Sequence, residues 1–120
     1  MNTPNIIIDI VVPTYHRYEI LTETLQSVQS QTYGRWECWI AEDGASDGTY
    51  AVVEPFLQDS RFHYLPGDHS GTPATPRNRA IRAGCAPYIA FLDDDDIWLP
   101  GKLEQQVSFL KNHPSCVLLG

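Results

Sequence analysis

Four consecutive aspartates, Asp93–Asp96, stand directly behind the short apolar run at residues 88–92. Neighbouring carboxylates repel one another, and an anion that loses water is costly unless a cation accompanies it. The first basic residue after them is Lys102. A hard divalent cation bound through oxygen would relieve the repulsion, and Mg²⁺ or Mn²⁺ commonly bridges protein carboxylates to a phosphate. The tetrad therefore predicts a metal site that faces a phosphate-bearing ligand.

The same four residues also fit a solvated acidic loop. In that interpretation the last aspartates, Asp96 above all, favour the start of a helix near Pro100, where negative charge is stabilised. Runs of charge commonly lie in solvent. The choice depends on which other side chains the fold brings to these aspartates.

Strand-like and helix-like patterns alternate along the chain, with short connections. The first strand-like run is rich in β-branched residues, which is typical of a strand buried on both faces of a parallel sheet. The run at 88–92 is also expected to be a buried strand. The pattern predicts an α/β fold with a mostly parallel, Rossmann-like sheet and right-handed crossovers. We expect strands at 6–12, 36–41, 61–65 and 88–92, and helices at 19–31, 48–57, 76–84 and 100–112.

Polar clusters follow three of these strands, namely Thr14–Arg17, Glu42–Gly44 and Asp93–Asp96. The carboxyl ends of parallel strands meet at one edge of a sheet, and ligands of α/β proteins bind outside that edge. We therefore expect the three clusters to face one ligand.

Each cluster has a functional and a structural interpretation. Tyr15 either stacks on a planar base or packs against the next helix, and Arg17 either meets a phosphate or is solvated. Glu42 and Asp43 are suited to accept hydrogen bonds from a base N–H or a sugar hydroxyl. Alternatively, residues 43–49 are a plain connection in which Asp47 caps the following helix.

The Pro- and Gly-rich segment at 66–79 suits a shaped loop over a ligand as well as an inert surface connection. Arg77 and Arg79 are two residues apart on the expected helix and point to different faces, so we expect one of them to face the acidic edge. The four histidines are isolated from one another, and we expect no metal-binding or catalytic role for them: His16, His63, His69 and His113.

Composition restricts the class of protein. The 120 residues make one domain, and the net charge of −7 argues against nonspecific binding to nucleic acid or to an anionic membrane. Neither a signal peptide nor a membrane-spanning stretch is predicted, which favours the cytoplasm. Cys38, Cys85 and Cys116 are expected to be small core residues in a reducing compartment. The apolar run at 116–119 looks like another strand, open to pairing with a second copy, and suggests a piece of a longer protein.

Five segments follow one another in a characteristic order. They are Ile10–Arg17, Gln29–Tyr33, Glu42–Thr49, Gly71–Gly84 and Phe91–Asp96, the last with an Asp-x-Asp motif and a following acid. Together they resemble the nucleotide-sugar-binding half of the family 2 glycosyltransferases with a GT-A fold. The resemblance runs from residue 8 to about residue 118, nearly the whole chain.

The resemblance implies that residues 1–120 form the donor-binding domain of an enzyme that transfers a sugar from a nucleoside-diphosphate sugar, usually UDP-linked, to an acceptor. It also implies inversion at the anomeric carbon and a place in cell-envelope polysaccharide biosynthesis. Tyr15 would flank the base, and Asp43 would hydrogen-bond it. Asp95, with Asp93, would ligate Mn²⁺ or Mg²⁺. The implied nucleotide-binding residues are Pro13, Thr14, Tyr15, Arg17, Asp43, Arg77, Asp93 and Asp94.

The chain departs from the family pattern at two positions. His16 stands where the family often has Asn, and Glu42 where it often has Asp. The acceptor-binding half and the carboxylate that acts as catalytic base are expected beyond Gly120. A metal-bound carboxylate is a poor base, so the tetrad is not assigned that role.

Two other functions remain open at this point. The first is a stand-alone nucleotide- or metal-binding module without transferase activity. The second is a metal-dependent phosphoryl-transfer enzyme, which would carry an acid pair after the first strand, where this chain has Pro13-Thr14.

Overall fold

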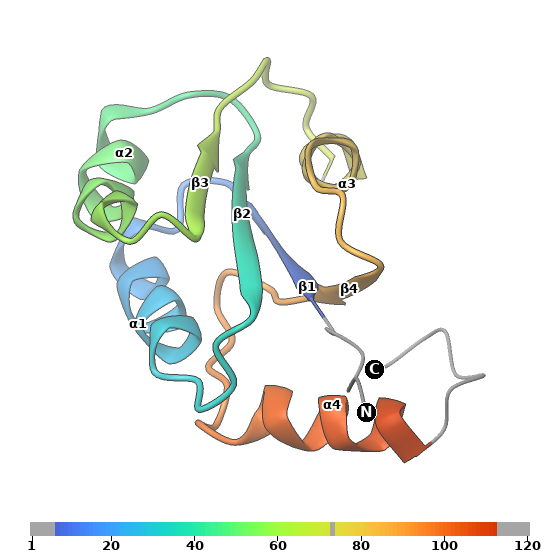
Figure 1. The fold of residues 1–120 in the computed structure, drawn as a ribbon. Coiled ribbons are helices and arrows are strands. Elements are labelled where there is room, and N and C mark those ends of the chain that lie inside the picture. Colours follow the sequence, from blue (N-terminus) through green and yellow to red (C-terminus); the bar gives the residue numbers. More distant parts are fainter. Residues whose placement is uncertain (1–6, 73, 113–120) are drawn as a thin grey trace.

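The computed structural model describes residues 7–72 and 74–112, which form a parallel four-stranded sheet in the order β3-β2-β1-β4 (Figure 1). The strands are β1 (Ile8–Thr14), β2 (Trp36–Glu42), β3 (Phe62–Leu65) and β4 (Tyr88–Phe91). The helices are α1 (Tyr18–Gln29), α2 (Asp47–Val53), α3 (Ala74–Ala83) and α4 (Lys102–Asn112), and a 3₁₀ turn, η1 (Glu54–Gln58), follows α2. The expected α/β fold is confirmed.

The two faces of the sheet are covered unequally. Ile8, Ile10 and Val12 of β1 point to the main core, which α1, α4 and the α2–η1 segment close. The opposite face has a small cluster of Val11, Ala41 and Ala80, over which α3 is the only one of the described helices to lie in Figure 1. Strand β1 is buried on both faces along its whole length, as its composition predicts.

Strand β4 differs from the expectation of a buried strand. It pairs with β1 alone among the described strands, and its side chains alternate between half-buried and exposed. Ile89 is 36% exposed and Phe91 is 47% exposed on the α3 side of the sheet. Its apolar composition was a sound predictor of a strand. Burial, however, also depends on neighbours that lie elsewhere in the sequence.

The other differences are local. The predicted helix at 48–57 is an α-helix only to Val53, because Pro55 cannot donate the next helical hydrogen bond and the chain tightens into η1. Ser46, not Asp47, caps α2, since its hydroxyl accepts the N–H of Thr49. Cys38 is buried as expected, whereas Cys85 is exposed.

Several of the expectations concern residues outside the described part of the chain. These are the apolar run at 116–119, its pairing with a second copy, and the environments of Cys116 and His113. Within the described part of the chain, no helix is long and apolar enough to cross a membrane.

Candidate functional site

A cavity of about 410 Å³ opens at the carboxyl ends of β1, β2 and β4. The three polar clusters that follow these strands line it together, as parallel geometry predicts. All the nucleotide- and metal-binding residues implied by the resemblance lie on its wall: Pro13, Thr14, Tyr15, Arg17, Asp43, Arg77, Asp93, Asp94 and Asp95.

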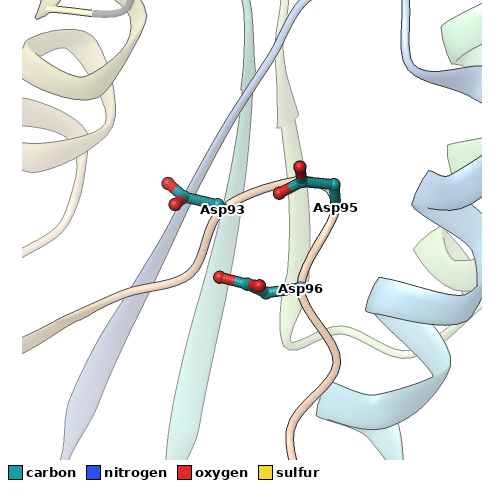
Figure 2. A group of neighbouring side chains, drawn as sticks. All are labelled: Asp93, Asp95 and Asp96. Atoms are coloured by element: carbon teal, nitrogen blue, oxygen red, sulfur yellow. The ribbon is translucent and has the colours of Figure 1, made fainter.

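The acidic tetrad divides into two parts. The N–H of Asp96 donates to the carbonyl of Asp93 across 3.1 Å, which closes a tight turn. As a result, carboxylate oxygens of Asp93, Asp95 and Asp96 lie within 4.8 Å of one another, and all three residues are exposed (Figure 2). No salt bridge joins these three to a described cation. Three converging carboxylates are a donor set that fits Mg²⁺ or Mn²⁺.

Asp96 therefore belongs with the other two aspartates and not with the next helix. Helix α4 begins at Lys102, six residues further along, so Asp96 is too distant to favour its first turn. The expectation that Asp96 serves the helix is wrong, and its proximity to Asp93 follows from the turn.

Asp94 points away from the other three and fastens the turn to β1. The hydroxyl of Thr14 donates to Oδ2 of Asp94 across 2.8 Å, and the hydroxyl of Thr24 in α1 donates to the Asp94 carbonyl across 3.0 Å. Burial raises the pKa of Asp94 above its usual range, and the charge of Asp95 adds to this. Hydrogen bonds from Thr14 and from the Tyr15 N–H, together with Arg17, offset part of the rise.

Asp43 holds the roofing loop, which is the segment at residues 69–72 that lines the cavity. Its carboxylate accepts the N–H of Ser70 at 2.6 Å, the hydroxyl of Ser70 at 2.9 Å and the N–H of Gly71 at 3.0 Å. Nδ1 of His69 lies 3.2 Å from Oδ2 of the same carboxylate. Burial acts to raise the pKa of Asp43, but the bonds from Ser70 and Gly71 and the nearby His69 lower it overall. Asp43 is thus held as a carboxylate beneath the loop.

Glu42 has an internal role that the sequence did not reveal. The residue is 1% exposed, and its carboxylate accepts hydrogen bonds from the Ser46 hydroxyl, the Thr49 hydroxyl and the Tyr64 hydroxyl. These bonds occupy its oxygens and fix the turn from β2 into α2. The structure therefore does not favour the interpretation of Glu42 as a ligand contact.

Arg77 and Arg79 of α3 separate as expected. Arg77 lines the cavity, with its guanidinium 5.5 Å from the ring centre of Phe91. Arg79 instead donates to the carbonyls of Glu42 at 2.8 Å and Leu65 at 3.2 Å. It joins the carboxyl ends of β2 and β3, so of these two arginines Arg77 is the one that lines the cavity with the acids.

Sequence reasoning missed His69. Its ring stacks on Tyr15, with ring centres 5.0 Å apart and planes inclined by 23°. The two residues are 54 positions apart, and nothing local marks the contact. The further cavity residues that were not predicted are Gly71, Thr72 and Pro76, all from the roofing loop and the start of α3.

His16 adopts a left-handed conformation, with φ of +51°. Asn enters this region more readily than most residues. The Asn that the family often has at this position therefore fits the same backbone turn, and the departure at His16 leaves the fold unchanged.

The family model of glycosyl transferase family 2 matches residues 9–120. The chain belongs to glycosyltransferase family 2. This agrees with the resemblance seen in the sequence and with the GT-A-like fold.

Curated relatives are longer glycosyltransferases. The chain is 38% identical over 110 residues to the Escherichia coli UDP-Glc:alpha-D-GlcNAc-diphosphoundecaprenol beta-1,3-glucosyltransferase WfgD, covering 91% of this chain and 43% of WfgD. It is 31% identical over 105 residues to the Bacillus subtilis putative teichuronic acid biosynthesis glycosyltransferase TuaG, covering 87% of this chain and 42% of TuaG. The chain thus spans less than half of these relatives.

Among solved structures, S. aureus TarS 1–349 in complex with UDP-GlcNAc superposes with a TM-score of 0.85 at 26% sequence identity. The match covers 90% of this chain and 32% of that chain. The GT-A-type architecture is therefore shared across nearly all of the present chain.

Proposed function

We propose that this chain is the donor-binding domain of a metal-dependent glycosyltransferase that uses a UDP-linked sugar. One observation carries the proposal. A single cavity joins an aromatic ring and a buried carboxylate, Tyr15 and Asp43, to a turn of converging carboxylates. A nucleoside diphosphate presents the matching sequence of groups, namely a flat base with an N–H, a ribose and a charged diphosphate.

The two ends of the cavity would bind different parts of the donor. Tyr15 offers a face for the base, and the carboxylate of Asp43 suits a ring N–H because an ionised carboxylate can only accept hydrogen bonds. Arg77 and Arg17 offer their guanidinium groups to the diphosphate oxygens. These four side chains would orient the base and the diphosphate of the donor.

The acidic turn would hold the metal. Asp95 and Asp93 are the proposed ligands, with Asp96 beside them, and their oxygen donors suit Mn²⁺ or Mg²⁺. When bound, such an ion offsets the charge that develops on the departing nucleoside diphosphate. Asp94, fastened by Thr14, keeps the turn at the end of β1.

The named substrates of the relatives support a UDP-linked hexose donor and an acceptor in cell-envelope polysaccharide biosynthesis. WfgD is named for transfer from UDP-Glc to a lipid-linked GlcNAc diphosphate, and TuaG for teichuronic acid biosynthesis. We further propose inversion at the anomeric carbon, a location in the cytoplasm, and an acceptor half and catalytic base outside the 120 residues. On this account the chain alone binds the donor and transfers no sugar.

The test is a turnover assay with UDP-glucose and UDP-GlcNAc, using lipid-linked GlcNAc diphosphate as acceptor. We expect the full protein to release UDP only with acceptor present, to form a β-linked product from the α-linked donor, and to lose activity in Asp95→Asn. We expect the 120-residue chain to release none. Binding of UDP by the full protein without transfer to any acceptor would favour a non-catalytic module.

A further inference from the structure

The imidazole of His69 makes two contacts that a nucleobase would make in this cavity. It stacks on Tyr15 with ring centres 5.0 Å apart, and its Nδ1 lies 3.2 Å from Oδ2 of Asp43. A flat ring on Tyr15 with a ring nitrogen beside Asp43 is also the arrangement proposed above for the base. His69 and the base therefore require the same space.

The space between the two rings is too small for insertion of a base. Each face-to-face contact between carbon atoms takes about 3.5 Å, so two rings with a base between them would be about 7 Å apart. The observed separation is 5.0 Å. A base can reach this face of Tyr15 only if the His69 ring leaves.

His69 is the partner of Asp43 that is free to leave. The other hydrogen bonds to Asp43 come from the N–H groups of Ser70 and Gly71 and from the Ser70 hydroxyl, which belong to the folded loop. The His69 side chain is 56% exposed, so its ring can swing into solvent without disturbing the loop. Its departure leaves Oδ2 of Asp43 with room for one more donor.

Behind this contact lies a second cavity of about 410 Å³, lined by His16, Gly44 and Asp68 among others. Tyr15, Asp43 and His69 line both cavities. His69 therefore lies on the boundary between the two cavities, at the place where the base would bind.

We propose that the His69 ring occupies the place of the nucleobase on Tyr15 and beside Asp43. The base of the donor displaces the ring from both residues when it binds. This inference rests on the proposed function. It also predicts the choice of base. Uracil carries an N3–H that replaces the imidazole nitrogen beside Asp43, whereas cytosine has an acceptor at N3 that the carboxylate repels.

The test compares the binding of UDP, in the presence of Mn²⁺, to the wild-type chain, His69→Ala and His63→Ala by calorimetry. His63 is the matched control, because it stacks on Trp39 at 4.1 Å and lies 3.1 Å from Glu37 without lining either cavity. Removing the competing ring should tighten UDP binding about two- to tenfold, the range that corresponds to one aromatic pair. His63→Ala should bind UDP as the wild type does, and CDP should bind more weakly than UDP to all three proteins.

A second measurement uses the unaltered protein. Proton NMR of the His69 ring should show loss of the ring-current shift from Tyr15 as UDP is added, while the His63 ring stays unchanged. Equal or weaker UDP binding by His69→Ala, or a His69 ring that keeps its shift when UDP is bound, would overturn the displacement and leave the proposed function standing. Failure of all three proteins to bind UDP would overturn both.

Discussion

The hydroxyl of Thr14, at the end of β1, donates to Oδ2 of Asp94 across 2.8 Å, and this bond ties the acidic turn to the sheet. Because Asp94 is engaged there, the side chains on either side of it, Asp93 and Asp95, are left to converge with Asp96. One aspartate of the tetrad thus positions the turn, and the other three bring their carboxylate oxygens together beside the cavity, which Asp93 and Asp95 line.

Thr14→Val should test this positioning role. Valine has a similar shape but no donor, so a half-buried carboxylate loses a partner, which costs about 1 kcal/mol of stability. The turn would also be less well held, and we expect UDP binding with Mn²⁺ to weaken several-fold in calorimetry. Thr22→Val, on the partly exposed face of α1, is the control and should leave binding unchanged. Undiminished UDP binding by Thr14→Val would contradict the role.

Asp43 should stabilise the loop that it holds in a way that depends on pH. Its pKa in the folded chain lies below the unfolded value of about 3.9. Its contribution is therefore present above about pH 4 and is lost as the pH falls through the folded pKa. Asp43→Asn should show a shallower fall of the urea midpoint between pH 5 and 2.5, and should lose most UDP binding.

Asp59→Asn is the matched control for that experiment. Hydrogen bonding to Arg61 lowers the pKa of Asp59, so this change should also flatten the acid dependence. Asp59 lies away from the cavity, so UDP binding should survive. If both variants keep UDP binding, Asp43 has no part in the base site.

Substitutions of Arg77 and Arg79 should have different effects, the first on nucleotide binding and the second on stability. Arg77→Gln should weaken the binding of UDP while changing that of uridine little, because its proposed partner is the diphosphate. Arg79→Gln removes charged hydrogen bonds to two backbone carbonyls and should lower the free energy of unfolding by about 1.5 kcal/mol. Denaturant unfolding and calorimetry on the same two variants measure both effects. Exchange of the two phenotypes would mean that the assignment is reversed.

Glu42 offers a test of the turn beneath the base site. In Glu42→Asp, the common residue of the family, the shorter side chain should no longer reach Tyr64, and stability should fall by about 1 kcal/mol. Tyr64→Phe removes the same bond from the other side. A double-mutant cycle should then show that Tyr64→Phe lowers the free energy of unfolding less in Glu42→Asp than in the wild type. Additive losses would indicate that the bond contributes nothing.

The sequence predicts the fold well because its signals are local and repeated. The β-branched run of β1 and the apolar spacing of α1 each specify an element, and parallel strand geometry then brings Thr14, Asp43 and Asp95 to one edge. The same logic separated Arg77 from Arg79, since residues two apart on a helix face different ways.

Contacts between distant parts of the chain were harder to predict from the sequence. The stacking of His69 on Tyr15 and the bond from Tyr64 to Glu42 depend on how loops fold back, and no local spacing encodes them. The prediction of the residue that caps α2 failed for another reason. Ser46 and Asp47 are both good capping residues, and only the backbone turn decides between them.

The central claim is that the acidic turn makes nucleotide binding depend on a divalent cation. Calorimetric titration of UDP into the chain, once with Mn²⁺ and once with a chelator, tests it most directly. We predict that UDP binds at least about tenfold tighter with Mn²⁺, that Asp95→Asn removes this difference, and that Asp47→Asn preserves it. Equal binding of UDP in Mn²⁺ and in chelator would contradict the claim.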